Sequence, residues 1–327
     1  MGKSECKFDL EKADSLEDAE NKYHMQDREL CLLPIEMILE IISHVNEAND
    51  FRSCMLLCKQ ILVLMYKTPN IMRKYQVSID LDHDGFMDLP IIKKRGKFIQ
   101  NLKVKFYKLS RLQSILSKVP NLEVLTYEHR SSNKQRTLKL PEMRYLKVLN
   151  SDDSCHKCFL TDSVNITKLA TLKFWIHNLE EAELFTNFLS GQTKLKQLTV
   201  LDDFILAHFF LTRDISNEIT FKLTKFEYTL NNFNENFQNF FKNQAGSLKE
   251  LTITFNPTYN VINTFFTKCK RLEKLIINHE CDFTPDDPPY WVLDSLKHFT
   301  THSVVNFTEI NKRFPNLISL DCNDLAR

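Results

Sequence analysis

Glycine is scarce in this sequence, with 5 residues among 327, which is about a fifth of the usual share. A loop that cradles phosphate needs glycine, because its backbone N–H groups must approach the ligand closely. The glycines stand at positions 2, 85, 96, 191 and 246, too far apart for a G-x-G-x-x-G or P-loop motif. The sequence therefore argues against dinucleotide-binding and kinase-like enzymes.

An excess of one charge, a long apolar run and an export signal are also missing. The 43 basic and 42 acidic residues leave a net charge of +1, too small to attract nucleic acid. No apolar run reaches the length of about 20 residues that spans a membrane, and the first residues contain no secretory signal. The nine cysteines are scattered and odd in number, which is typical of reduced thiols. We expect a cytoplasmic or nuclear protein, or one found in both compartments, that binds neither nucleic acid nor membranes.

Sequence motifs for catalysis or metal binding are absent. There is no H-E-x-x-H and no G-x-S-x-G, the signatures of zinc proteases and serine hydrolases. Cys155 and Cys158 form a C-x-x-C, but a zinc site needs four ligands and no second pair follows at a suitable spacing. His177, His279 and Cys281 could complete such a site only through an accident of folding. We therefore expect no catalytic residue, no metal ion and no cofactor.

The strongest positive signal is an internal repeat, apolar-x-x-apolar-x-apolar, seen most clearly at Leu122, Leu125 and Tyr127. Its copies recur at intervals of 21 to 28 residues, which is typical of solenoid proteins. The other clear copies have their middle residue at Leu172, Leu198, Phe226, Leu251, Leu275 and Leu320, and the weaker copies at Leu102, Leu149 and Phe299. A half-copy at Ile79 and Leu81 would begin the array. The repeats predict an array of about ten irregular units over residues 75–327.

We expect each copy of the repeat to form a short strand. Between these strands lie apolar stripes at helical spacing. They comprise Leu109, Leu112, Leu116 and Val119; Phe185, Phe188 and Leu189; Phe233, Phe237, Phe240 and Phe241; and Val261, Phe265, Phe266 and Cys269. Neither a strand nor a helix of one repeat can bury its apolar face alone, so the repeats must stack. We predict an α/β solenoid with parallel strands on the concave face and helices on the convex face.

The residues before the repeats predict a different kind of module. Residues 1–29 mix acidic and basic residues and predict a mobile tail. Residues 30–74 predict a helical module, whose first helix starts at Pro34 and whose second starts near Asp50. The second helix is apolar around most of its circumference. Such a small module must dock against another surface.

Both parts resemble known families. The repeats resemble leucine-rich repeats over residues 75–327. That family has asparagine five residues after the middle leucine, and only Asn231 and Asn256 match, so an irregular array is expected. Residues 30–72 resemble an F-box, through Leu33-Pro34-x-Glu36 and the apolar residues that follow, although Ile61 stands where that family usually has tryptophan.

An F-box followed by leucine-rich repeats resembles the substrate receptors of SCF (cullin–RING) ubiquitin ligases. The resemblance implies a non-catalytic receptor whose F-box binds a Skp-family adaptor, and through it cullin, while the repeats bind a protein to be ubiquitinated for proteasomal degradation. The implied adaptor-binding residues are Leu33, Pro34, Ile38, Ile41, Ile42, Val45, Phe51 and Leu57. Alternatives are a non-degradative scaffold, an enzyme regulator that clamps its partner, and a helical cap in place of the F-box.

The strand pattern also predicts a binding face. Residues beside the buried positions of each strand point to the concave surface, and they are mostly polar: Glu128, Asp152, Lys173, Thr199, Glu227, Thr252, Lys274, His298, Thr300 and Asp321. Trp175, Leu201 and Ile276 are apolar exceptions, and Trp291 lies on a predicted long loop over 281–291. We expect these four residues to contact the substrate. The alternative is that the loops of the longer repeats cover Trp175 and Leu201.

Overall fold

The structure is a computed structural model, and a defined part of the chain is described. This part comprises residues 34–45, 76–80, 92–93, 95–106, 109–129, 141–151, 168–176, 178–202, 211–229, 234–254, 266–278 and 292–326, with the single positions 68, 73 and 166. All statements below concern these residues.

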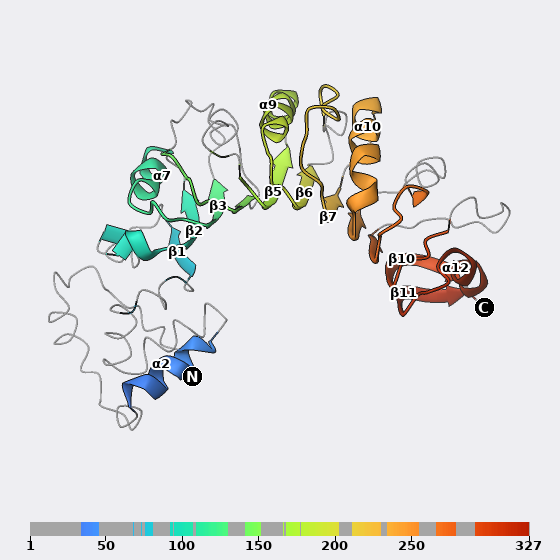
Figure 1. Ribbon diagram of the computed structural model, residues 1–327, viewed down its shortest axis with the longest axis horizontal. Coiled ribbons are helices and arrows are strands. Elements are labelled where there is room, and N and C mark those ends of the chain that lie inside the picture. Colours follow the sequence, from blue (N-terminus) through green and yellow to red (C-terminus); the bar gives the residue numbers. More distant parts are fainter. Residues whose placement is uncertain are drawn as a thin grey trace, which may run out of the picture. The chain divides into compact units, whose positions relative to one another are not determined.

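Eleven parallel strands form one sheet, in which they follow one another in sequence order (Figure 1). The strands are β1 (Gln76–Asp80), β2 (Asn101–Phe106), β3 (Val124–His129), β4 (Val148–Ser151), β5 (Thr171–Ile176), β6 (Gln197–Asp202), β7 (Lys225–Tyr228), β8 (Glu250–Ile253), β9 (Lys274–Ile277), β10 (His298–Asn306) and β11 (Ser319–Ala326). Such a sheet of consecutive strands is consistent with a repeat solenoid, because each strand pairs with those of the repeats before and after it. The predicted α/β class and parallel strands are confirmed.

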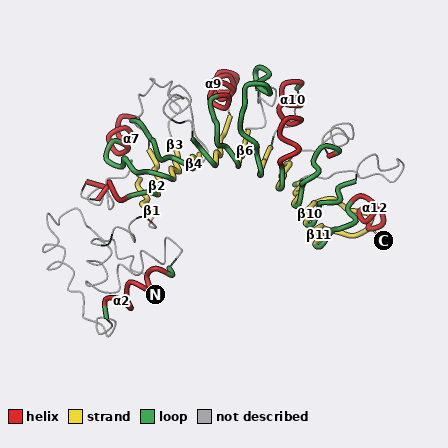
Figure 2. Tube along the Cα trace, in the orientation of Figure 1, coloured by secondary structure: helices red, strands yellow, loops and turns green. Residues whose placement is uncertain are grey.

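The chain divides into two compact units, residues 1–132 with 138–146, and residues 133–137 with 147–327. The first unit contains strands β1 to β3, and its helices are α2 (Ile35–Ser43), η3 (Gly96–Phe98) and α7 (Leu109–Leu116). The second contains β4 to β11, and its helices are α9 (Leu179–Ser190), α10 (Glu235–Gln244), η5 (Ala245–Ser247) and α12 (Phe307–Arg313). In the second unit α9 and α10 lie on one side of the strands (Figure 2). The predicted helix from Asp50 lies outside the described residues.

Strand register confirms the sequence repeat residue by residue. Leu102 pairs with Leu125 in the first unit, and Leu172 pairs with Leu198 in the second. The same alignment of middle residues continues from Leu198 through Phe226, Leu251, Leu275, Phe299 and Leu320. From Ile99 to Thr301, all three inner residues of every predicted repeat are buried. The periodic pattern is therefore the pattern of the core.

The half-copy at the start of the array was misplaced. Val77, and not Ile79, pairs with the middle residue Leu102, while Ile79 pairs with Val104. Val77 and Ile79 are both buried, and Leu81 lies outside the described residues. A shift of two residues leaves the same strand face buried, so alternation alone could not distinguish the two registers.

Aromatic rings fill the core between β7 and α10. Phe226 lies 6.2 Å from Phe237 and 6.0 Å from Phe240, measured between ring centroids. Tyr228 stacks on Phe237 at 4.5 Å. This packing confirms the apolar stripe of the helix, whose start is capped because the Asn234 side chain accepts a hydrogen bond from the Phe237 N–H. Phe233 lies outside the described residues.

Glycine is required at one of the described positions. A Cβ atom on Gly96 would lie 2.2 Å from the carbonyl oxygen of Lys118, so the backbone of η3 approaches the end of the α7 segment more closely than any side chain allows. Gly246 in η5 is a natural comparison, because a Cβ there would meet nothing within 4 Å.

We expect Gly96→Ala to destabilise the protein by about 1–3 kcal/mol, because the added methyl group must displace backbone. The Gly246→Ala control should change stability by less than about 1 kcal/mol. Urea unfolding followed by circular dichroism measures both variants. Equal stability of the two variants would contradict the close approach at Gly96.

Candidate functional site

Helix α2 presents apolar side chains in two directions. Ile38 and Ile42 are 2% exposed, whereas Met37 and Ile41 are 51% and 50% exposed. Met37 and Ile41 are four residues apart and therefore share one face of the helix. The helix begins directly after Pro34, whose carbonyl oxygen accepts hydrogen bonds from the N–H groups of Met37 and Ile38 at 3.0 and 3.1 Å. One face of α2 is thus packed, and a neighbouring face presents an apolar pair to solvent.

The other predicted adaptor-binding residues are placed in part. Pro34 is exposed and Val45 is half-buried. An exposed hydrogen bond between the Glu40 carboxylate and the His44 ring, at 3.0 Å, lies beside the apolar pair of α2. Leu33, Phe51 and Leu57 lie outside the described residues.

The predicted polar surface lies on the face of the strands that points away from the core. Every predicted polar position of this face is half-buried or exposed, except Asp152, which lies outside the described residues. Neighbouring strands exchange polar contacts there: the Thr199 hydroxyl donates to the Glu227 carboxylate at 3.2 Å, and Lys225 lies 3.3 Å from Glu250. Exposed contacts of this kind contribute little to stability, so they leave the face available for binding.

Two of the predicted contact residues lie side by side. Trp175 of β5 pairs in register with Leu201 of β6, so their side chains share one face of neighbouring strands. Both are half-buried. Ile276 is also half-buried, but it lies on β9, three strands away from β6, and pairs there with two threonines. Trp291 lies outside the described residues, so the four predicted residues do not form one cluster within the described part.

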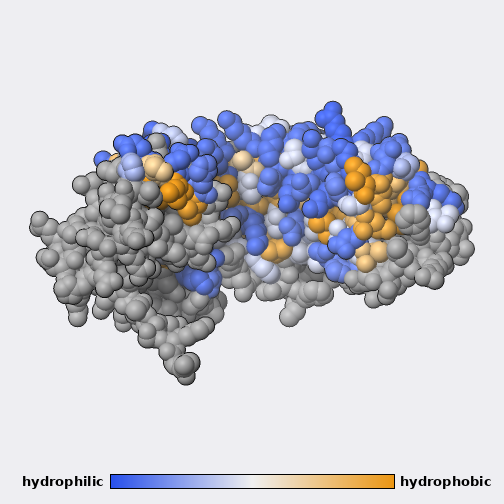
Figure 3. Space-filling model, turned by 90° about the horizontal axis from the view of Figure 1, so that it is seen from below, coloured by the Kyte–Doolittle hydropathy of each residue, from blue (hydrophilic) through white to orange (hydrophobic). Residues whose placement is uncertain are grey.

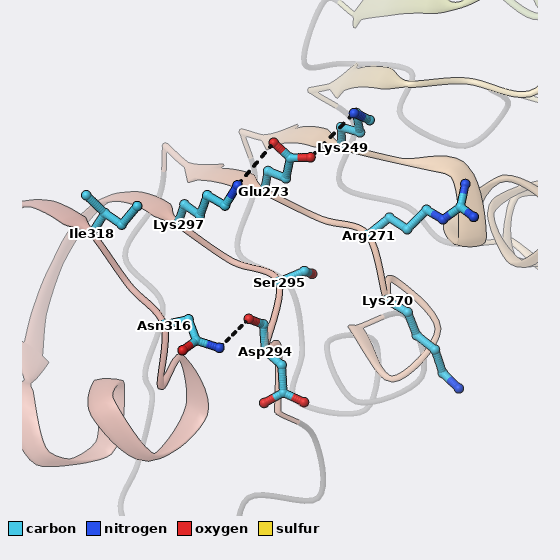
Figure 4. Close-up of a pocket in the computed structure, with 9 residues that line it drawn as sticks. All are labelled: Lys249, Lys270, Arg271, Glu273, Asp294, Ser295, Lys297, Asn316 and Ile318. Carbon is cyan, nitrogen blue, oxygen red and sulfur yellow. Dashed lines mark hydrogen bonds and ion pairs between the residues drawn. The ribbon is translucent and has the colours of Figure 1, made fainter.

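An open hollow of about 650 Å³ lies beside the start of the last strands (Figure 4). It is lined by Lys249, Lys270, Arg271, Glu273, Asp294, Ser295, Lys297, Asn316 and Ile318. Glu273 is flanked by two lysines, with its carboxylate 3.4 Å from the Lys249 Nζ and 3.9 Å from the Lys297 Nζ. Ile318 is 71% exposed. Figure 3 shows the molecule from below, with mostly hydrophilic residues and a few apolar groups among them.

Hydrogen bonds between repeats hold the floor of this hollow. The Asn316 amide donates to the backbone oxygen of Asp294, and the Ser295 hydroxyl donates to that of Leu272, both at 2.8 Å. Asn121 and Ser247 make the same kind of bond to earlier repeats. All four residues stand directly before the first apolar residue of a repeat. Sequence reasoning missed them, although a polar residue fixed at this position was a visible signal.

Sequence reasoning also missed the hollow and its lysines. The predicted binding face began at the first residue of each strand, and Lys249 and Lys297 stand one residue earlier. They occupy equivalent positions of two repeats, each two residues before the middle apolar residue, Leu251 or Phe299.

Four described groups have shifted pKa values. The hydrogen-bonded ion pair of Glu142 and Arg144 lowers the pKa of the carboxyl and raises that of the guanidinium. The Asp214 carboxylate accepts hydrogen bonds from Ser216 and Asn239, which lowers its pKa. Burial raises the pKa of the Cys269 thiol to about 12. None of these groups lies in the hollow.

Within the described residues, no three histidine, cysteine, aspartate or glutamate side chains converge as a metal site would require. In the same part of the chain, no helix is long and apolar enough to cross a bilayer.

Comparison with known proteins gives no assignment: no protein-family model matches the sequence, and no curated protein matches it either.

We expect the Cys269 thiol to resist a maleimide in the native protein, because the thiolate is the reactive form and burial disfavours it. Because the folded protein favours the neutral thiol, burial of Cys269 contributes fully to stability below the ordinary thiol pKa near 8.5. This contribution is lost as the pH rises from there towards about 12, the pKa of the buried thiol. Peptide mass spectrometry after labelling should find Cys322 modified, and Cys269 modified only after denaturation. Equal labelling of both in the native protein would contradict this expectation.

Proposed function

We propose that this chain is the substrate-recognition subunit of an SCF-type ubiquitin ligase, with an F-box at residues 30–74 and leucine-rich repeats after it. One end binds a Skp-family adaptor and through it cullin, and the other binds the protein to be ubiquitinated. The chain performs no chemistry itself. It acts by proximity, because it holds lysines of the target within reach of the conjugating enzyme.

The apolar pair of helix α2 is the observation that supports the adaptor-binding end best. A folded protein usually covers large apolar side chains, yet Met37 and Ile41 are each about half exposed on a helix that already buries Ile38 and Ile42. Such an amphipathic helix suits a partner with a complementary apolar groove. The Glu40 and His44 pair would form part of the polar rim.

The strand face supports the substrate-binding end. Its exposed positions on the parallel strands are mostly polar, and it carries Trp175 beside Leu201. Aromatic and apolar side chains surrounded by polar groups are favoured anchors at interfaces. An open face with anchors suits a protein partner better than a small molecule, which needs an enclosed pocket.

The adaptor-binding end is tested by Ile41→Asp in the full chain. We expect this change to reduce co-purification of a Skp-family adaptor by tenfold or more, because a buried carboxylate in an apolar interface is unfavourable. The matched control is Ile318→Asp, the same change at an exposed isoleucine of the second unit, which should leave adaptor binding unchanged. Failure of the unmodified chain to bind any Skp-family adaptor would overturn the proposal.

The substrate-binding end is tested by Trp175→Ala combined with Leu201→Ala. Proteins recovered with the chain from proteasome-inhibited cells should decrease at least fivefold, while adaptor recovery stays constant. The control is Glu183→Ala with Lys242→Ala, which changes two exposed residues of helices α9 and α10 away from the strand face. Co-purification of cullin and shorter half-lives of the recovered proteins are expected for a ligase. Adaptor binding without either result would instead indicate the non-degradative scaffold.

A further inference from the structure

The residues that stand directly before the strands of the second unit form a row, one from each strand. We name it the strand-start row, and its members are Lys147, Ala170, Lys196, Thr224, Lys249, Glu273, Lys297 and Ile318. Lysine occupies every second position of the row, directly before the strands β4, β6, β8 and β10. All four lysines are exposed. The chain has a net charge of only +1, so this row is a local concentration of positive charge.

Backbone hydrogen bonds fix the position of each row member. The carbonyl oxygen of Lys249 accepts the N–H groups of Glu273 and Lys274, at 2.8 and 2.9 Å. The carbonyl oxygen of Lys297 accepts those of Ile318 and Ser319 in the same way, at 2.8 and 3.0 Å. Every earlier member of the row makes the same double contact with the next repeat. The Cα atoms that carry the lysines are therefore held at a regular spacing.

This spacing has a definite value. Neighbouring strands lie about 4.8 Å apart, so lysines on alternate strands are separated by about 9.6 Å at their backbones. A peptide in the polyproline II conformation rises about 3.1 Å per residue with three residues per turn, so every third side chain lies on one face at intervals of about 9.3 Å. The two periods agree closely.

Glu273 adds to the selectivity for a peptide with an acidic residue at every third position. It lies between Lys249 and Lys297 and contacts both, and it would repel an acidic side chain placed between the two lysines. The other intervening positions, Ala170 and Thr224, carry no charge. A ligand with an anionic group at every third residue matches the lysines and avoids Glu273, whereas a contiguous acidic run does not.

The hollow at the end of the row adds two cations. Lys270 and Arg271 line it from the turn before β9, and within the described residues neither is ion-paired with a carboxylate (Figure 4). The exposed Ile318 offers an apolar contact beside them. The row itself contains no aromatic side chain on which a base could stack, and the phosphates of a nucleic acid strand are much closer together than the lysines.

We propose that the strand-start row binds an extended acidic peptide segment of a partner protein, with a carboxylate at every third residue. The proposal goes beyond the ligase function, since the row lies on the second unit and involves no residue of α2. It would hold for a receptor or a scaffold alike.

The test measures the binding of fluorescent peptides to the full chain by fluorescence anisotropy at low salt. The probe contains four Glu-Pro-Pro triplets, and a second peptide of identical composition has its four glutamates in one run. A third peptide replaces glutamate with glutamine. The triplet peptide should bind at least fivefold more tightly than the clustered one, the glutamine peptide should not bind, and added salt should weaken binding.

Variants of the chain locate the site. Lys249→Gln with Lys297→Gln should weaken binding of the triplet peptide about fivefold, the sum of two exposed ion pairs. Lys118→Gln with Lys242→Gln removes the same charge elsewhere and should have no effect; both lysines are exposed. Circular dichroism checks that the variants remain folded. Ile41→Asp should bind the peptide normally, so failure of adaptor binding and failure of this proposal remain distinguishable.

Several results would overturn the proposal. Equal affinity for the triplet and clustered peptides, or equal losses in the two lysine pairs, would indicate unspecific charge attraction. Binding only by a phosphoserine version of the triplet peptide would replace carboxylate recognition with phosphate recognition. Tighter binding of a single-stranded oligonucleotide with the same loss in the Lys249 and Lys297 variant would indicate a nucleic acid ligand.

Discussion

A backbone carbonyl that accepts two N–H groups is the contact on which the array depends. It recurs before β2 and before each of the strands β4 to β10: Gln100 accepts from Glu123 and Val124 in the first unit, and Lys249 accepts from Glu273 and Lys274 in the second. Both donors belong to the next repeat, so this bond holds neighbouring repeats together. Backbone groups alone do not choose a register, and burial of the inner leucines selects the one observed. The exposed face follows from it.

Short polar side chains connect several of the repeats. The leucine-rich-repeat pattern has asparagine five residues after the middle leucine, and the two residues that match it here, Asn231 and Asn256, lie outside the described part. Four of the described repeats use a polar residue directly before their first leucine, such as Asn121 or Ser295, which donates to a carbonyl of the previous repeat. Serine and asparagine can both do this because the bond needs only a short donor, so the sequence can vary while the geometry stays constant.

Burial explains how much of the fold the sequence predicts. The inner positions of each repeat must be apolar, so residues such as Leu172 and Phe226 reveal their strands directly. The misplaced half-copy at Ile79 shows the limit, since a shift of two residues keeps the same face inward. The candidate sites are harder to predict for the same reason. Trp175 and Leu201 could be predicted to face away from the core, but their pairing depends on register, and both are half-buried. The hollow around Glu273 combines turns from four repeats.

The alternation of lysines before the strands bears on function because the fold does not require it. The residue at this position contributes its carbonyl oxygen and N–H to the array, and this does not require lysine, as Ala170 and Thr224 show. Four exposed lysines therefore contribute little to stability, while their like charges repel one another weakly across alternate strands. Glu273 lies between Lys249 and Lys297 and contacts both. Lysine thus recurs at a position where folding does not require it, which agrees with the proposed acidic ligand.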